Sequence, residues 1–329
     1  MKHFGLLTCL LISLALLLAP GALAQAASDD FFTWLGQLRA DARAAGISQQ
    51  TLAVALAKVA APQPQTLERD QNQPEKKESL AAYVATRVNR ERIDAGRTTL
   101  KRYPTWLGRV ERQYRVQRRF LVALWGIESF YGRHTGDHPV IPALVTLAYD
   151  KRRGDYFRKE LIEALKILDA GQVTLARLQG SWAGAMGPFQ FMPSSYRHYA
   201  VDVDGDGRKN IWGSTPDALA SAANYLAKAG WKVDQTWGRP VRLPKDFDPS
   251  LAGLDTRLPL ARWQALGVRR SNGRALPRRN LQASLIIPDG PTGPAYLVYD
   301  NFRALRRWNR SNSFAVAVGT LADTLRTTP

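Results

Sequence analysis

The amino-acid sequence predicts a mainly α-helical protein of the α+β class, with one small β-containing subdomain. Apolar residues recur at helical spacing over most of the 329 residues. The pattern changes after Trp231, because Pro, Gly and short apolar runs dominate from Val241 to Tyr299. A hydrophobic content of 45% in a chain of this length is enough for one large core or a few smaller ones.

The first residues have the composition of an export leader. Lys2 supplies a positive charge, and the apolar run from Leu6 to Leu18 is shorter than the about 20 residues that a membrane-spanning helix needs. Ala22-Leu23-Ala24 fits a signal-peptidase site. We therefore predict a signal peptide over residues 1–24, cleavage after Ala24 and no membrane span. The alternative is an uncleaved N-terminal anchor.

Cysteine content and charge narrow the classes of function. Cys9 is the only cysteine and lies in the leader, so disulfides, thiolate chemistry and cysteine metal sites are excluded from the mature chain. The formal net charge of +18 attracts polyanions. For an exported protein we expect an anionic wall polymer or membrane face as the partner, and we see no motif for reading nucleic acid. The alternative is that the arginines only maintain solubility.

Residues 28–117 are predicted to form an N-terminal helical domain. Asp30 to Val59 shows apolar residues at helical spacing. Ala61 to Glu78 is polar and contains prolines, which predicts a loop or an extended arm. Tyr83 to Tyr114 is predicted to be a long basic helix, with a second helix beginning at Pro104.

Residues 118–232 are predicted to form the central domain. Arg118 to Gly132 reads as a buried helix that Gly132 ends, and Tyr149 to Leu168 reads as an amphipathic helix. Thr215-Pro216-Asp217 carries the N-cap signals of a helix that ends near Gly230. We expect the small β-containing subdomain over residues 233–299, and C-terminal helices over residues 300–329 that pack back on the central domain.

Glu128 is the first candidate for chemistry. It stands near the end of the almost wholly apolar run from Leu121 to Gly132. Burial among apolar groups raises the pKa of a carboxyl, and the negative end of a helix dipole acts in the same direction. A Glu that stays protonated near neutral pH suits general acid catalysis of glycosidic bond cleavage. The alternative is a structural Glu paired with one of the arginines.

The segment from Trp182 to Pro193 is the second candidate. Its small residues let a backbone approach a ligand closely. Gln190 offers an amide donor and acceptor, and the Trp, Met and Phe side chains offer apolar walls for sugar rings. A glycine-rich loop of this kind is weak evidence when it is taken alone.

Together these segments resemble the B-type lytic murein transglycosylases, which have a lysozyme-like core. The resemblance extends from about Ser28 to Ala322. Its motifs, in chain order, are Trp125-Gly-Ile-Glu128-Ser, Thr146-Leu-Ala-Tyr-Asp150 with Arg152-Arg153 downstream, Ser181 to Tyr196, Asn224-Tyr225-Leu, and Asn301-Phe302 followed by Asn309-Arg-Ser.

The resemblance implies an enzyme with a soluble, lysozyme-like catalytic core. It implies cleavage of the MurNAc–GlcNAc β-1,4 bond of peptidoglycan without water, which leaves 1,6-anhydromuramyl ends, and no cofactor for catalysis. Glu128 matches the single Glu that acts first as acid and then as base. Ser181, Gln190, Tyr225 and Asn309 match positions that contact sugar. Trp308 and Phe314 stand where the family usually has Tyr, so they keep a stacking surface and lose a hydroxyl.

An irregular EF-hand-like loop predicts a structural Ca²⁺. Asp202, Asp204 and Asp206 occupy positions 1, 3 and 5 of such a loop, and a glycine follows at position 6. Position 12 is a glycine here, and Asp217 comes four residues later as the acid that would close the site. Arg208 would give only its backbone carbonyl. The B-type family carries a similar loop. The alternative is a solvated loop in which Asp217 only caps a helix.

Two other functions stay open at this point. A hydrolytic muramidase needs a second carboxylate, and the nearby Asp137, Asp150 and Asp155 all lack a compelling sequence context. A non-catalytic, calcium-stabilised wall-binding protein would need no acid at all. In each case we expect a periplasmic monomer that acts on peptidoglycan glycan strands and that has possible partners in wall-synthesis complexes.

Overall fold

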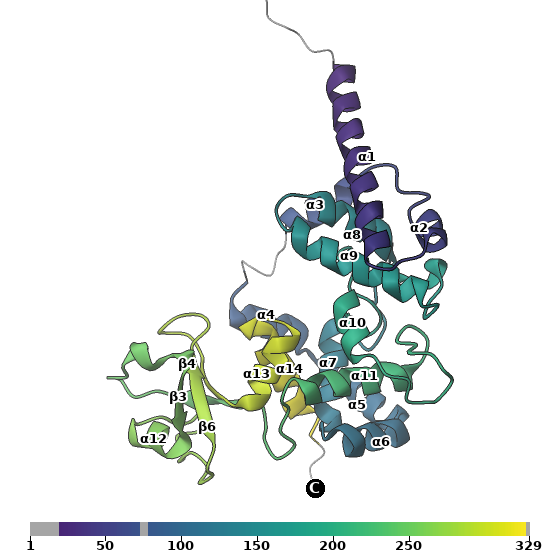
Figure 1. Ribbon diagram of the computed structural model, residues 1–329. Helices are drawn as coiled ribbons and strands as arrows, with labels where there is room; N and C mark the ends of the chain where they lie inside the picture. Colours follow the sequence, from purple (N-terminus) through teal and green to yellow (C-terminus); the bar gives the residue numbers. More distant parts are fainter. Residues whose placement is uncertain (1–19, 73–77, 327–329) are drawn as a thin grey trace, which may run out of the picture.

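The computed structural model describes residues 20–72 and 78–326, and it is mostly helical with one small sheet, as predicted. Figure 1 shows two groups of helices, one above the other, with the sheet beside the lower group. The predicted leader lies outside the described residues, except for Pro20 to Ala24, which begin the first helix. Within the described part of the chain, no helix is both long and apolar enough to cross a membrane.

The upper group of helices combines the start of the chain with a hairpin from its middle. It contains α1 (Pro20–Ala44), α2 (Gln49–Ala55), α3 (Pro64–Gln71), α8 (Val140–Tyr149) and α9 (Gly154–Asp169). Helices α8 and α9 pack on each other, α2 contacts α9, and α3 contacts α8. Phe31, Leu35 and Leu38 of α1 are buried at helical spacing, which fixes the face that α1 turns inward.

The prediction of a loop over Ala61 to Glu78 is wrong for residues 64–71, which form α3. Pro64 suits the first turn of a helix, where its missing N–H is not needed. The buried Asp70 then forms ion pairs with Arg152 and Arg153 of the segment between α8 and α9. Tertiary contacts therefore stabilise a helix that local composition does not favour.

The lower group of helices surrounds one buried helix. It contains α4 (Leu80–Arg87), α5 (Arg90–Arg102), α6 (Pro104–Tyr114), α7 (Arg118–Ser129), α10 (Pro193–Tyr199), α11 (Thr215–Lys228), α13 (Asp300–Trp308) and α14 (Asn312–Thr324). Helix α7 contacts α5, α6, α11 and α14, so Phe120 to Leu124 are completely buried. A helix that is apolar on every side needs such an environment.

Five antiparallel strands form the sheet beside this group. They are β3 (Gly238–Arg242), β4 (Gly253–Pro259), β5 (Arg269–Arg270), β6 (Gln282–Ile286) and β7 (Ala295–Val298), in the order β4-β6-β7-β3-β5. Helix α12 (Leu260–Ala265) and the 3₁₀ turn at Pro249–Leu251 complete the subdomain. Leu285 pairs with Leu297, and both join Trp263 in a hydrophobic core that is separate from the helical core.

A two-stranded ribbon and a short turn connect the two groups of helices. Strand β1 (His138–Pro139) pairs with β2 (Gln179–Gly180), and a 3₁₀ turn at Leu175–Arg177 precedes β2. The helices of the predicted N-terminal domain are divided between the groups, because α2 and α3 contact α8 and α9 whereas α4 and α6 contact α14 and α11. The division of the chain at residues 118, 233 and 300 stays a prediction.

Several predicted element boundaries need correction. Helix α7 ends at Ser129 and not at Gly132, because Phe130 already adopts a left-handed conformation. Tyr149 ends α8, and the amphipathic helix α9 begins only at Gly154. The N-cap of α11 is Ser214, whose hydroxyl accepts a hydrogen bond from the backbone N–H of Asp217, so Thr215 is the first helical residue.

Candidate active site

Glu128 lies in the last turn of α7 and is half-buried. Its Oε1 accepts a hydrogen bond of 2.7 Å from the indole Nε1 of Trp308, the last residue of α13. The sequence assigned Trp308 a stacking surface and did not predict this donor. The only signal in the sequence was the residue type at position 308. The family that the sequence resembles usually has Tyr there, and Trp308 replaces its hydroxyl with an indole N–H.

The chain turns sharply after Glu128. Phe130 and Tyr131 have φ values of 52° and 60°, and Gly132 follows at 86°, so three successive residues are left-handed. Ser129 supports the turn, because its hydroxyl donates to the Pro188 carbonyl at 2.6 Å and accepts from the Gly132 N–H at 2.9 Å. Backbone conformations of this kind are costly, and they persist where the surroundings impose them, often at functional sites.

Arg92 of α5 occupies the carboxyl end of α7. Its Nε donates to the Gly126 carbonyl at 3.0 Å, and its own carbonyl accepts from the Tyr131 hydroxyl at 2.7 Å. Burial lowers the pKa of Arg92, but a guanidinium stays charged at physiological pH. A cation at this point opposes the negative end of the helix dipole. The helix dipole therefore influences Glu128 less than the sequence alone predicts.

The glycine-rich segment folds into a tight loop after β2. Met186 forms isolated β-bridges to Gly180 and Phe191, and the Ser181 hydroxyl accepts hydrogen bonds from the backbone N–H groups of Ala183 and Ala185. A Cβ added to Gly180 would lie 2.1 Å from the Ala185 carbonyl oxygen, so this close approach requires glycine. Ser181 thus holds the loop together, in addition to its predicted contact with sugar.

Gln190 has a fixed orientation within this loop. Its φ is 49°, and its amide nitrogen donates to the carbonyls of Thr135 and Gly187 at 3.0 and 2.9 Å. No described residue donates a hydrogen bond to its Oε1, which can accept one from a ligand. Both N–H groups of the amide are used in the protein, so we expect Gln190 to act toward a sugar as an acceptor.

Aromatic rings form a wall around Trp308. The ring of Tyr225 meets it edge to face with centroids 4.6 Å apart, and Phe191 does so at 5.0 Å. The Tyr225 hydroxyl donates to the Arg307 carbonyl at 2.7 Å, and burial raises the pKa of Tyr225 to about 12. Tyr225 is half-buried, so it combines a fixed position with an exposed part that a sugar ring can contact.

The two remaining predicted sugar contacts differ. Asn309 follows Trp308 directly, is half-buried, and accepts a hydrogen bond from the Ser311 N–H through Oδ1 at 3.0 Å. Phe314 is only 3% exposed and belongs to the helical core. A ring without an exposed face cannot stack on a sugar, so we withdraw Phe314 from the predicted site.

Glu160 is a buried carboxylate that no sequence pattern predicted. Its two oxygens accept hydrogen bonds from the backbone N–H and the hydroxyl of Ser194, at 2.8 and 2.7 Å. Ser194 lies in the first turn of α10, where a negative charge is favourable. Glu160 therefore fixes the point where the glycine-rich segment enters α10. No spacing in the sequence links two residues that are 34 positions apart.

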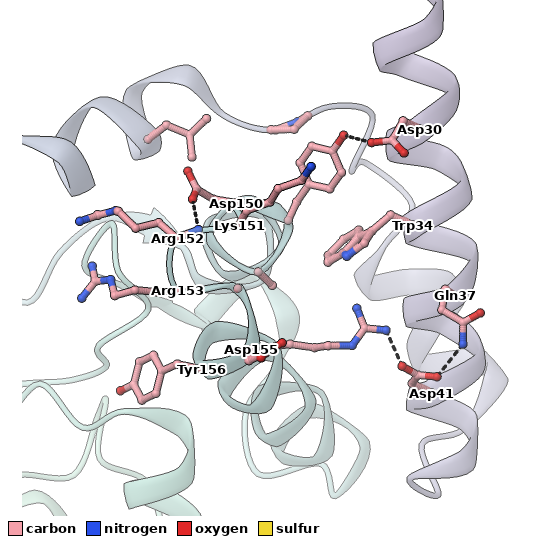
Figure 2. Close-up of a pocket in the computed structure, with 16 residues that line it drawn as sticks. Asp30, Trp34, Gln37, Asp41, Asp150, Lys151, Arg152, Arg153, Asp155 and Tyr156 are labelled. Carbon is pink, nitrogen blue, oxygen red and sulfur yellow. Dashed lines mark hydrogen bonds and ion pairs between the residues drawn. The ribbon is translucent and has the colours of Figure 1, made fainter.

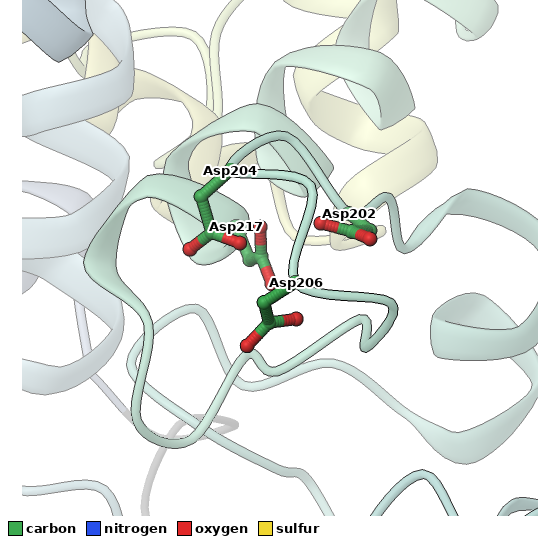
Figure 3. Close-up of side chains that lie close together, drawn as sticks. All are labelled: Asp202, Asp204, Asp206 and Asp217. Atoms are coloured by element: carbon green, nitrogen blue, oxygen red, sulfur yellow. The ribbon is translucent and has the colours of Figure 1, made fainter.

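The predicted calcium ligands come together around one loop (Figure 3). Asp202, Asp204, Asp206 and Asp217 each offer a carboxylate oxygen, and these oxygens lie within 4.8 Å of one another. Ligands at Ca²⁺–O distances of 2.3–2.6 Å are separated by at most about 5 Å, so the spacing fits this ion. Arg208 is exposed, and its backbone N–H donates to Asp206. Only its carbonyl remains available to a cation.

Asp217 is the buried member of this cluster. It is completely buried, and its two oxygens accept hydrogen bonds from the N–H groups of Val203 and Asn210 at 2.9 and 2.8 Å. Burial, with a smaller contribution from Asp204 and Asp202, raises the pKa of Asp217, although the two N–H groups oppose this shift. A buried carboxyl next to two other acids is a position that a cation would stabilise.

A separate cleft of about 1160 Å³ lies between α1 and the segment that joins α8 to α9 (Figure 2). Asp150 and Asp155, two of the candidates for a second catalytic carboxylate, line it, and Asp150 accepts a hydrogen bond from the Arg152 N–H. Asp137, the third candidate, has a 93% exposed side chain that pairs with His138. Within the described part of the chain, neither Glu128 nor Trp308 lines this cleft.

Comparisons with known proteins agree with one another. A family model described as Transglycosylase SLT domain matches residues 30–323. Membrane-bound lytic murein transglycosylase B from Escherichia coli (strain K12) is 34% identical over 250 residues, which make up 72% of this chain and 64% of that protein. This chain therefore spans slightly less than two thirds of the length of that relative.

Solved structures are also similar. SltB3 from Pseudomonas aeruginosa, in complex with NAG-anhNAM-pentapeptide, is 46% identical with a TM-score of 0.85, over 90% of this chain and 79% of that chain. Slt35 from Escherichia coli, in complex with calcium, is 30% identical with a TM-score of 0.76, over 88% of this chain and 92% of that chain. Since the family model covers almost the whole described chain, the protein belongs to the transglycosylase SLT-domain family.

Proposed function

We propose that this chain is a lytic transglycosylase that cleaves the MurNAc–GlcNAc β-1,4 bond of peptidoglycan without water. The observation that carries the proposal is the half-buried Glu128 carboxylate, which Trp308 holds beside Tyr225 and the glycine-rich loop. The names of the relatives support the reaction type, and the NAG-anhNAM-pentapeptide bound to SltB3 supports the anhydro product.

In this reaction Glu128 first donates its proton to the glycosidic oxygen, so the bond to the anomeric carbon breaks and the GlcNAc-bearing strand leaves with a hydroxyl. The positive charge that develops on the muramyl ring needs stabilisation, which the acetamido group of the substrate supplies in the family that the sequence resembles. The muramyl C6 hydroxyl then attacks the anomeric carbon and gives its proton to Glu128. Glu128 ends protonated, and no water is consumed.

The residues around Glu128 orient the sugar chain. Tyr225 and Trp308 present aromatic surfaces to sugar rings, and Gln190 Oε1 and Asn309 offer polar contacts at the rim. The four aspartates of the calcium loop have a structural role, in which Ca²⁺ would hold the loop against the start of α11. We also propose export to the periplasm as a monomer, after removal of residues 1–24.

The test combines product analysis with one substitution. Purified protein is incubated with murein sacculi, and the soluble products are identified by mass spectrometry. We expect 1,6-anhydromuramyl ends, and we expect Glu128→Gln to lose at least about 100-fold in turnover while it still binds sacculi. Glu68→Gln, at an exposed position of α3, is the matched control and keeps full turnover.

Other products point to other functions. Reducing muramyl ends would show a hydrolytic muramidase. Binding without product from either protein would show a wall-binding protein. Unchanged lysis by Glu128→Gln would contradict the role of Glu128.

A further inference from the structure

A small pocket lies where the β-containing subdomain joins the lower group of helices. It has a volume of about 300 Å³, and its walls come from the start of α7, the linker from Val233 to Thr236, β3, the loop before β6 and the end of α14. The charged side chains that line it are four arginines and one aspartate: Arg119, Arg239, Arg279, Arg326 and Asp234. A pocket of this size accommodates a small charged group and not an oligosaccharide.

The linker is fixed from two sides. Gln117, the N-cap residue of α7, donates from its side-chain amide to the carbonyls of Val233 and Gln235 at 2.5 and 3.1 Å. The completely buried Asn301 also donates to the Gln235 carbonyl, at 3.0 Å. The pocket is therefore formed before a ligand binds, and little affinity would be lost to ordering it.

Two carboxylates neutralise only part of the positive charge. Asp323 pairs with Arg119 at 2.8 Å, and Arg326 lies 3.6 Å from the same carboxylate. Asp234 meets Arg279 at 3.4 Å, and both of these side chains are more than half exposed. Long ion pairs between exposed groups are weak. Arg279 and Arg326 can therefore turn toward another anion at little cost.

Arg239 has no carboxylate partner in the described chain. Its Nε donates to the neutral Tyr299 hydroxyl at 2.7 Å, and its two terminal nitrogens form no hydrogen bond with any described residue. Burial raises the pKa of Tyr299, and the charges of Arg239, Arg270 and Arg279 oppose this shift. Three guanidinium groups thus act on one point beside the pocket, where their field concentrates anions.

The pocket is distant from Glu128. Arg119 lies in the first turn of α7 and Glu128 in the last. At a rise of 1.5 Å per residue the two are about 14 Å apart along the helix axis. Helix α7 is buried, so a path over the surface is longer. A fully extended pentapeptide spans at most about 17 Å. We therefore expect a peptide in this pocket to come from a different part of the wall than the sugar at Glu128.

We propose that this pocket is an exosite that binds a carboxylate of a peptidoglycan stem peptide. The inference rests on the proposed function and adds a second contact with the same polymer. Free peptide ends are carboxylates, and their two oxygens match the two parallel donors of a guanidinium. A carboxylate beside Arg239 and Arg279 would offset the unbalanced charge and hold the enzyme on the wall while Glu128 acts on glycan.

Matched variants test the exosite by their binding to sacculi. All carry Glu128→Gln, so that turnover does not remove the ligand, and co-sedimentation at one salt concentration measures affinity. We expect Arg279→Gln to weaken binding at least about fivefold, and Arg239→Gln combined with Arg279→Gln at least about 20-fold, because each change removes charge-assisted hydrogen bonds. Arg278→Gln removes the same charge from an exposed neighbour that does not line the pocket, and we expect less than about a twofold change.

Nuclear magnetic resonance on the unmodified enzyme identifies the ligand without dependence on variant folding. The Arg239 Nε–H is hydrogen-bonded, which slows its exchange with water, and comparison with Arg239→Gln assigns its signal. The probes are N-acetyl-D-alanyl-D-alanine, its C-terminal amide and inorganic phosphate. We expect the free acid to shift the signal with a Kd on the order of 1 mM, and the amide to leave it unchanged.

The outcomes separate this inference from the proposed function. Equal affinities of the Arg279→Gln and Arg278→Gln proteins for sacculi would overturn the exosite, as would a signal that the free acid does not move. A signal that phosphate moves and the acid does not would assign the pocket to a phosphate-bearing partner, such as a lipid headgroup, and would overturn the assignment to wall peptides. None of these results would affect the proposed function, which fails only if Glu128→Gln stays active or if anhydro ends are absent.

Discussion

Hydrogen bonds of three side chains support the turn that follows Glu128. Arg92 donates a hydrogen bond to a carbonyl in the last turn of α7, and Ser129 donates one to a carbonyl of the glycine-rich loop. The Tyr131 side chain packs against α7, and its hydroxyl donates to the Arg92 carbonyl. The turn is left-handed at Phe130 and Tyr131, so these bonds must offset its conformational cost. Such support keeps the carboxylate in one place, as acid–base catalysis requires.

Gly126 allows Tyr131 to pack in this way. A Cβ added to Gly126 would lie 2.6 Å from the Tyr131 hydroxyl oxygen and 2.7 Å from its Cζ. We predict that Gly126→Ala displaces the ring and lowers the free energy of unfolding by about 1–3 kcal/mol, as other overpacked cores do. Turnover should fall too, because displacing the Tyr131 ring also shifts Arg92 and the turn that follows Glu128. Denaturant unfolding and lytic assays measure the two effects.

The matched control for this substitution is Gly36→Ala in α1. No atom lies within 4 Å of the added Cβ there, so the better helix propensity of alanine should raise the free energy of unfolding by about 0.5–1 kcal/mol. If both variants had the same stability, Tyr131 would not be packed as described.

The EF-hand-like loop connects the start of α11 to α10 and β2, the two elements on either side of the glycine-rich segment. Tyr196 donates from its hydroxyl to the Lys209 carbonyl, and Trp212 donates to the Gln179 carbonyl at 3.3 Å. We predict that adding Ca²⁺ to chelator-treated protein raises the melting temperature and that Asp217→Asn abolishes the rise. Asp246→Asn, at an exposed position of the β-containing subdomain, is the control and keeps it. Scanning calorimetry measures the shift, and an unchanged rise in Asp217→Asn would exclude this site.

The pH dependence of the free energy of unfolding is a second test of the role of Asp217 in this loop. The folded-state pKa of Asp217 is raised, so the folded protein without Ca²⁺ holds this proton more tightly than the unfolded chain does. The stability that Asp217 contributes is therefore complete below the ordinary aspartate value of about 4 and is lost as the pH rises through the raised value. In chelator, lowering the pH from 7 toward 4 should stabilise the unmodified protein relative to Asp217→Asn. Bound Ca²⁺ should reverse this trend, because protons compete with the ion.

Periodicity and capping signals in the sequence predicted some helices correctly. They did not predict helices that depend on contacts between distant parts of the chain or that are apolar throughout. Helix α7 and the start of α6 at Pro104 follow from periodicity and capping. Helix α3 was predicted as a loop, because the pairing of its Asp70 with Arg152 and Arg153 joins residues about 80 positions apart. Helix α8 was not predicted, because an almost wholly apolar run gives no periodic signal.

The candidate site shows the same limit. Motifs predicted a role for Glu128, Tyr225 and the glycine-rich loop, because these residues belong to short and specific patterns. The Trp308 donor, the Glu160 bond to Ser194 and the Arg92 bond to α7 depend on helices that meet only in the fold. The burial of Phe314 is likewise set by how α14 packs on α7.

The whole molecule combines a large helical core with a small β core and carries a formal net charge of +18. Exposed arginines are not all neutralised by ion pairs, so the field of the protein favours binding to a carboxylate-rich polymer. This attraction acts over about one Debye length, which is about 10 Å at 0.1 M salt. The proposed contacts of Trp308 and Tyr225 with a sugar ring would be different, because salt screens such uncharged contacts little.

We therefore predict that binding to sacculi and binding to a neutral oligosaccharide respond differently to salt. The protein is used as Glu128→Gln, so that turnover does not remove the ligand. Affinity for sacculi, measured by co-sedimentation, should fall at least about tenfold between 50 mM and 500 mM NaCl, because the Debye length shrinks severalfold over this range. Affinity for a chitooligosaccharide, measured by calorimetry, should change less than about twofold. Sacculus binding that is independent of salt would show that the net charge maintains solubility and does not recruit the wall.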